Sequence, residues 1–146
     1  MYIFRFFVDA SKMNSMPSFL NQISKINDNL YLSSFVGTTE YNLLKFRITC
    51  VISACRETPK VVMKNVEAVQ LNVQDKPTEY LAKYFDVVAD KMNEVIKRNG
   101  IVLVHCVAGI SRSTSMILAY LMKHKRMRLR DAHNMVKLRR SFVSNN

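Results

Sequence analysis

The sequence predicts an α/β domain with a mainly parallel central sheet flanked by helices. Two apolar runs, residues 48–54 and 101–104, have the profile of buried strands. Between them, residues 81–96 carry apolar side chains at spacings of three and four, which predicts an amphipathic helix, and Gly100 stands where such a helix ends. Strands that alternate with helices in this way favour a layered domain with parallel strands.

Shorter patterns predict the remaining elements of the first half. Residues 26–32 (INDNLYL) have the pattern of a turn that leads into a short strand. Thr38 or Thr39 can cap a helix that ends near Phe46. Residues 69–73 alternate between apolar and polar side chains, which predicts a half-exposed strand.

Two helices are expected after the second buried strand. Residues 114–122 are apolar nearly all round, which predicts a buried helix, and a final helix is expected over about 129–140. The polar segment 9–18 has the composition of a linker. We therefore expect an N-terminal arm and linker over residues 1–18 and a single folded domain over residues 19–146.

Composition restricts the class of protein and its partners. The 146 residues include 22 Lys and Arg against 11 Asp and Glu, a net charge of +11 that favours acidic or phosphorylated partners. The basic run over residues 123–130 has no interleaved aromatic side chains, so nucleic acid is not an expected partner. Three cysteines, Cys50, Cys55 and Cys106, do not form a disulfide framework. One of the first two could form a reversible disulfide with oxidised Cys106.

Two features bear on localisation. No apolar run approaches the roughly 20 residues of a membrane-spanning helix, so no transmembrane segment is expected. Residues 1–8 are apolar and aromatic but lack the basic start of a signal peptide, and they favour an arm or an added strand. We expect a cytoplasmic protein, with the nucleus and a mitochondrial address left open.

The most informative segment is HCVAGISRS, residues 105–113. It places Cys106 at the carboxyl end of a buried strand, where open α/β sheets bind ligands, and Arg112 at the start of the next helix. A free thiol is a poor nucleophile at neutral pH, but a helix N-terminus, a ring of backbone N–H groups and a guanidinium all favour the thiolate. The same N–H ring fits a tetrahedral oxyanion, and Arg112 can bind two of its oxygens.

Neighbouring residues have expected supporting roles. Gly109 allows the loop to bend, Ser113 can place a hydroxyl near the sulfur, and His105 is expected to fix the loop by hydrogen bonding. The residues expected to bind a substrate phosphate are Val107, Ala108, Gly109, Ile110, Ser111 and Arg112.

This segment resembles the phosphate-binding loop of the cysteine-dependent protein-tyrosine phosphatase superfamily. The sequence around it is similar to that of the small atypical dual-specificity phosphatases. INDNLYL, YFDVVADKM and DAHNMVKLRR resemble that family as well, so the likeness covers about residues 22–140. It implies a protein-tyrosine-phosphatase-like fold and hydrolysis of phosphotyrosine and phosphoserine/threonine on proteins, protein kinases included as candidate substrates. It also implies a cysteinyl-phosphate on Cys106, with no metal or cofactor required.

The resemblance also implies a general acid on a loop about thirty residues before the cysteine. Asp75 lies 31 positions upstream of Cys106, beside Pro77, and is the candidate for protonating the leaving oxygen.

Two alternatives and one departure from the family stay open. The same loop could serve a phosphoinositide or RNA 5′-triphosphate phosphatase, although its uncharged interior favours protein substrates. It could also serve a non-catalytic phosphate-binding module.

The sequence departs from the family pattern after Arg140. In relatives, a proline and one more helix follow the paired arginines, whereas here Ser141 follows Arg140 and the usual last helix is expected to be missing. We expect the surface left uncovered to be protected by the N-terminal arm or by self-association.

Overall fold

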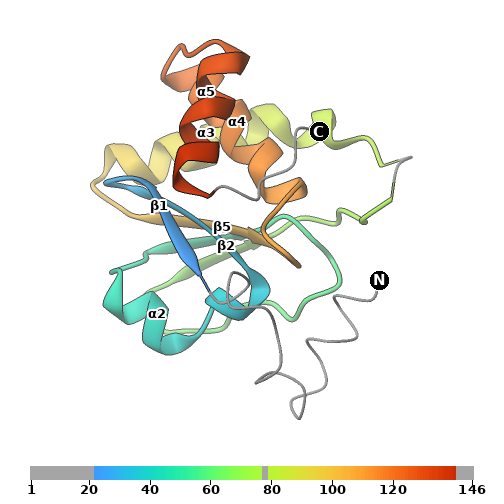
Figure 1. Ribbon diagram of the computed structural model, residues 1–146. Helices are drawn as coiled ribbons and strands as arrows, with labels where there is room; N and C mark the ends of the chain where they lie inside the picture. The colour runs from blue at the N-terminus through green and yellow to red at the C-terminus, as the bar shows by residue number, and fades with distance from the viewer. Residues whose placement is uncertain (1–21, 77–78, 141–146) are drawn as a thin grey trace.

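The computed structural model describes residues 22–76 and 79–140, which fold around one five-stranded sheet (Figure 1). The strand order is β1-β2-β5-β3-β4. β1 pairs antiparallel with β2, and all other pairs are parallel, which confirms the predicted mainly parallel sheet. The strands are β1 (Ile23–Asn27), β2 (Leu30–Ser34), β3 (Cys50–Ser53), β4 (Glu67–Gln70) and β5 (Val102–Cys106).

Helices cover both faces of this sheet. In Figure 1, α3, α4 and α5 lie above the sheet and α2 lies below it. Each face has its own cluster of buried apolar side chains, and the larger one lies on the side of α3, α4 and α5. The helical elements are η3 (Phe35–Gly37), α2 (Glu40–Lys45), η4 (Leu81–Tyr84), α3 (Phe85–Lys97), α4 (Arg112–His124) and α5 (Leu129–Arg139).

β5 is the central strand of the sheet. Its last residues therefore lie in the middle of the edge at which the parallel strands end. It pairs with β2 on one side and β3 on the other, and all five of its residues are buried. Its continuous apolar sequence suits a strand with both faces covered. Cys106, its last residue, lies opposite Ser34 of β2, and His105 lies opposite Ser53 of β3.

Most predicted elements are present. The Thr39 hydroxyl accepts a hydrogen bond from the amide of Asn42 and caps α2, which ends at Lys45 as expected. The amphipathic pattern over 81–96 corresponds to η4 followed by α3, and the two last helices are α4 and α5. The run 48–54 corresponds to the shorter strand β3.

Two predictions in the first half were incomplete or wrong. The turn over 26–32 joins two strands, because residues 23–27 form an additional strand that pairs with β2 as a hairpin. The predicted strand 69–73 is displaced, because β4 spans Glu67–Gln70. Leu71 and Val73 keep the alternation and are buried, but lie beyond the strand as the chain turns toward the site.

Three predictions fall on residues that lie outside the described part: the N-terminal arm, the loop position of Pro77, and the departure from the family pattern after Arg140. Among the described residues, no helix combines the length and apolar character needed to cross a bilayer.

Candidate active site

The site lies where β5 ends and α4 begins. Cys106 is the last residue of β5, Arg112 is the first residue of α4, and the five residues between them form a tight loop. Both residues are buried, with 3% and 4% of their total surface exposed. A central strand followed by a tight turn and a buried helix aims the helix N-terminus at this loop, which favours negative charge there.

Two hydrogen-bonding groups contact the sulfur of Cys106. The amide of Gly109 donates a hydrogen bond to Sγ over 3.2 Å, and the Ser113 hydroxyl lies 3.1 Å from the same atom. Ser113 is fully buried in the first turn of α4. Because donors of this kind stabilise a negatively charged sulfur, both contacts suit a thiolate.

The carbonyl groups of the loop point away from the sulfur. The Val107 carbonyl accepts from the Phe35 amide at 3.0 Å, and the Ala108 and Gly109 carbonyls accept from the Arg140 guanidinium at 3.4 and 3.0 Å. In a trans peptide the N–H points opposite to the carbonyl. The amides that follow these three carbonyls therefore point toward the inside of the loop, where they form a concave set of donors for an anion.

Glycine is required at position 109 for two reasons. Its φ is +69°, a conformation that other residues rarely adopt. A Cβ there would also lie 2.5 Å from the carbonyl carbon and oxygen of Ser33 in β2. The loop therefore packs directly against the backbone of the neighbouring strand.

Arg112 is held by a partner that the sequence did not reveal. Its two terminal nitrogens each donate to one oxygen of Glu57 at 2.8 Å, and Nη1 also donates to the Val73 carbonyl at 3.1 Å. The side chains of this pair are only 5% and 9% exposed. Burial opposes the charge of Arg112, but the hydrogen bonds to Glu57 and the negative charges around it together outweigh burial, and the pKa of Arg112 is raised. The guanidinium is therefore a fixed cation beside the loop.

Arg140 supports the loop from behind. Besides the two loop carbonyls, it contacts the Gln22 carbonyl and the Ser24 hydroxyl, both at 3.0 Å, and only 1% of its surface is exposed. Burial lowers the pKa of Arg140 to about 10, so it remains charged at neutral pH. The sequence offered Arg140 only as part of an arginine pair, with no indication of this contact.

His105 links the loop to β3. Its Nδ1 lies 3.2 Å from the Cys106 carbonyl, which can only accept, so Nδ1 carries the proton. In the neutral ring, Nε2 then accepts from the Ser53 hydroxyl at 2.6 Å. Burial lowers the pKa of His105 to about 4, so the ring is neutral at physiological pH. These contacts suit the loop-supporting role predicted for it.

Asp75 lies on a loop that is tied to Arg112. The carbonyl of Val73, two residues before Asp75, accepts from Arg112 and from the amide of Arg56. Asp75 itself is exposed. The structure thus brings the loop of Asp75 to the guanidinium, and the role of Asp75 as acid stays a prediction.

The place of Glu57 in the sequence could have identified it as a candidate site residue. It follows β3, the neighbour of β5, and the carboxyl ends of parallel strands meet at one edge. No comparable local signal marks Arg140, whose partners Gly109 and Ser24 are 31 and 116 residues away. Within the described residues there is no group of three or more His, Cys, Asp and Glu side chains that could hold a metal ion.

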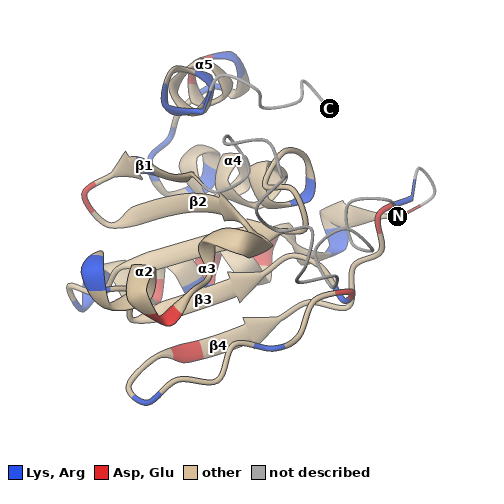
Figure 2. Ribbon diagram, turned by 60° about the horizontal axis from the view of Figure 1, so that its bottom comes forward, with Lys and Arg blue, Asp and Glu red and all other residues tan. Residues whose placement is uncertain are grey.

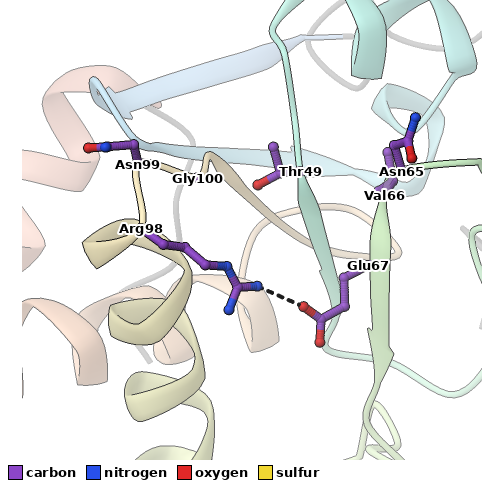
Figure 3. Close-up of a pocket in the computed structure, with 7 residues that line it drawn as sticks. All are labelled: Thr49, Asn65, Val66, Glu67, Arg98, Asn99 and Gly100. Atoms are coloured by element: carbon purple, nitrogen blue, oxygen red, sulfur yellow. Dashed lines mark hydrogen bonds and ion pairs between the residues drawn. The ribbon is translucent and has the colours of Figure 1, made fainter.

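A second hollow lies at the opposite edge of the sheet (Figure 3). It has a volume of about 490 Å³ and lies before the starts of β3, β4 and β5, among Thr49, Glu67 and Gly100. Its main charged groups are paired, since Arg98 contacts Glu67 at 3.1 Å and Glu94 at 2.8 Å. This edge therefore presents no buried, fixed guanidinium comparable to that of Arg112 beside the loop at Cys106.

The fold and this loop define an α/β domain with a phosphate-loop signature between a central strand and a helix. The family described as "Dual specificity phosphatase, catalytic domain" matches residues 30–146, and the chain belongs to this family, as predicted. The mouse protein named dual specificity protein phosphatase 14 is 41% identical over 125 residues, which cover 85% of this chain. The chain spans 63% of the length of that relative.

Two further comparisons agree. The human protein named dual specificity protein phosphatase 21 is 38% identical over 138 residues, which cover 94% of this chain and 72% of that protein. The crystal structure of a mouse putative dual specificity phosphatase complexed with zinc tungstate superposes with a TM-score of 0.80 at 26% identity, over 85% of this chain and 79% of that one. The predicted protein-tyrosine-phosphatase-like fold is thereby confirmed.

Proposed function

We propose that this chain is a dual-specificity protein phosphatase that hydrolyses phosphotyrosine and phosphoserine/threonine in proteins. The observation that carries the proposal is the arrangement around Cys106: its sulfur faces the Gly109 amide and the Ser113 hydroxyl, and Arg112 is fixed beside the loop by Glu57. Family membership and the relatives named phosphatases support it.

The proposed reaction has two steps. In the first, the Cys106 thiolate attacks phosphorus, the ester P–O bond breaks, and Asp75 gives its proton to the leaving oxygen. Arg112 and the inward-facing loop amides bind the phosphoryl oxygens as charge develops on them. In the second, water attacks the phosphorus of the cysteinyl-phosphate and gives a proton to the Asp75 carboxylate, the S–P bond breaks, and the Ser113 hydroxyl donates to the sulfur as it leaves as a thiolate. Water thus supplies the oxygen of the inorganic phosphate.

The phosphate-binding part of the proposal has an independent probe. The mouse structural relative is a complex with zinc tungstate, and tungstate is a tetrahedral oxyanion like phosphate. We expect tungstate to bind in the loop between Cys106 and Arg112 and to compete with substrate. A crystal soaked in tungstate that shows the loop empty would contradict the proposal.

The catalytic part is tested by phosphate release from paired phosphotyrosine and phosphothreonine peptides. We expect Cys106→Ser to release no phosphate, because the nucleophile is lost. Asp75→Asn should lose about 10²–10⁴-fold in rate, the usual contribution of a positioned acid. Cys50→Ser, which changes a buried cysteine at the far end of β3, is the matched control and should retain activity. An active Cys106→Ser protein would overturn the mechanism.

The remaining alternatives are outcomes of the same assay. Faster turnover of soluble phosphoinositides or of RNA 5′-triphosphate than of phosphopeptides would replace protein as the substrate. Tungstate binding without turnover would indicate a non-catalytic phosphate-binding module.

Phosphorylated proteins, protein kinases among them, are the proposed partners, in the cytoplasm or nucleus. Figure 2 shows basic residues on the turns of α5, and the preceding residues Lys125, Arg126 and Arg128 are exposed. Such a basic surface favours association with phosphorylated proteins.

Self-association remains a proposal. An apolar groove of about 610 Å³, lined in part by Phe85, Leu118, Met122 and Leu129, lies between α3, α4 and the start of α5. Sedimentation of the chain with and without residues 1–18 tests whether a second copy or the N-terminal arm covers it.

A further inference from the structure

Asp75 lies between two points at which the backbone is fixed. Before it, the Val73 carbonyl accepts hydrogen bonds from Arg112 Nη1 and from the Arg56 amide, both at 3.1 Å. Val73 is fully buried, whereas Asp75 is exposed. Two residues of chain span at most about 7 Å, so the Cα of Asp75 lies within that distance of the Cα of Val73. The first fixed point therefore keeps the backbone before Asp75 at the guanidinium of the site.

The second fixed point is Glu79. Its Oε1 atom accepts a hydrogen bond from the Gln74 amide over 3.2 Å. Its own amide donates to the Lys76 carbonyl over 3.0 Å. A carboxylate oxygen is a stronger acceptor than a neutral oxygen, which suits it to hold a backbone amide. The two contacts thus hold the chain one residue before Asp75 and one residue after it.

The side chain of Asp75 is not held in the same way. Among the contacts of the described residues, its carboxyl group has no hydrogen-bond or ion-pair partner, whereas Glu79 is half-buried. A general acid must come within about 2.6–3.2 Å of the oxygen that it protonates. A displacement of about 1 Å can cost about 10²-fold in rate. For an exposed side chain without a partner of its own, the backbone that carries it determines where it can reach.

We propose that Glu79 is a positioning residue for Asp75, because it holds the backbone on both sides of the acid and so keeps the carboxyl group within reach of the leaving oxygen. The inference rests on the proposed function and on the acid role of Asp75 within it. Glu79 does not touch the substrate in this proposal, and the proton still comes from Asp75. Its loss should therefore affect only the steps in which Asp75 gives or takes a proton.

Two leaving groups separate this role from a merely structural one. The alkoxide of threonine is a strong base and needs a proton as it leaves, whereas dinitrophenolate is a weak base and leaves without one. Removal of the Glu79 carboxylate should slow the reaction of a phosphothreonine peptide and leave that of dinitrophenyl phosphate unchanged. A variant that loosened the fold or displaced Arg112 would slow both substrates.

The test compares kcat/KM on the two substrates, since this constant reports the first step, up to release of the leaving group. We expect Glu79→Ala to lose about 10–10²-fold on the peptide, part of the contribution of a positioned acid, and to keep its rate on dinitrophenyl phosphate. Glu79→Gln retains an oxygen that can accept from the Gln74 amide, so it should keep most of both rates. Glu94→Ala, which removes an exposed glutamate of α3, is the matched control and should keep both rates.

A double variant shows whether the effect passes through Asp75. In the Asp75→Asn background the acid is already lost, so the addition of Glu79→Ala should lower kcat/KM on the peptide no further. Hydrogen exchange gives a readout that does not depend on activity. The Gln74 amide should exchange faster in Glu79→Ala than in the unmodified chain, while the Leu71 amide, which donates to the Ser53 carbonyl at 2.9 Å, should not change.

Four results would overturn the inference: an unchanged rate of Glu79→Ala on the peptide, equal losses on both substrates, a loss in Glu79→Gln as large as in Glu79→Ala, or a further loss when Glu79→Ala is added to Asp75→Asn. Any of them in a chain whose turnover depends on Cys106 would refute this inference and leave the proposed function intact. An unmodified chain that releases no phosphate from either substrate would refute the proposed function, and with it the acid that Glu79 is inferred to position.

Discussion

Arg112 and Arg98 both pair with glutamates, at opposite edges of the same sheet, in very different surroundings. Arg112 makes two parallel hydrogen bonds to Glu57 inside the protein, with 5% and 9% of the side chains exposed. Arg98 contacts Glu67 and Glu94 at the surface, where the three side chains are 54%, 39% and 58% exposed. The same residue types thus form a fixed buried pair at one edge and a solvated network at the other.

The difference shows what fixes the position of a charged side chain. A buried pair has lost its water, so each member depends on the other, and the planar guanidinium has one orientation. An exposed pair exchanges its partners with water and salt at little cost. Only the edge with Cys106 therefore presents a guanidinium whose place is set by the fold.

Removing the carboxylate from the buried pair should have the largest effect on stability. Glu57→Gln leaves the charge of Arg112 buried without a counter-ion, and we expect unfolding free energy to fall by about 3–5 kcal/mol, as for other broken buried pairs. The measurement is urea unfolding, with phosphopeptide turnover measured in parallel. A stability equal to that of the unmodified chain would show that Arg112 does not need this partner.

Acid should have a smaller effect, through His105. Its pKa is about 4 in the folded protein because of burial, below the ordinary value of 6.5. Between these two values the unfolded chain binds the proton more readily, so stability falls as the pH drops from about 6.5 to about 4. The loss contributed by His105 approaches about 3 kcal/mol at the lower limit.

The control for this prediction is His105→Gln, which cannot titrate. Urea unfolding at a series of pH values should show a shallower loss in the variant than in the unmodified chain. Parallel curves for the two proteins would show that His105 is not the group responsible.

The smallest effect is expected at the other edge. Glu67→Gln removes one acceptor from Arg98 and from Lys91, but these groups reach solvent and Arg98 retains Glu94. We expect a urea midpoint close to that of the unmodified chain, and a difference that decreases further with added salt. A loss as large as that of Glu57→Gln would remove the contrast between the two edges.

The local part of the site could be predicted from the sequence because nine consecutive residues carry it. Cys106, Gly109 and Arg112 lie on one strand, turn and helix, whose patterns are visible in the residues themselves. Glu57 and Arg140 could not be assigned in the same way. Their contacts join segments 55 and 31 residues apart, and only the packing of the strands and of α5 determines them.

The errors in the fold have a similar origin. The alternation of apolar and polar side chains over 69–73 predicts which residues are buried, and Leu71 and Val73 are indeed buried. Alternation does not show where pairing with the neighbouring strand stops. This depends on β3: the last paired residue is Gln70, and the Leu71 amide makes one more hydrogen bond, to the Ser53 carbonyl. β1 was not predicted because its five residues are stabilised by pairing with β2.

The position of Arg140 sets a boundary for any shortened form of this chain. The guanidinium that supports the turn after Cys106 belongs to Arg140, 28 positions beyond the arginine at the start of α4, and it also contacts the Gln22 carbonyl near the other limit of the fold. A fragment trimmed at the end of α4 would keep every residue of the signature and still leave two of its peptide groups without support. The minimal unit for engineering or crystallisation is thus defined by a residue outside the motif.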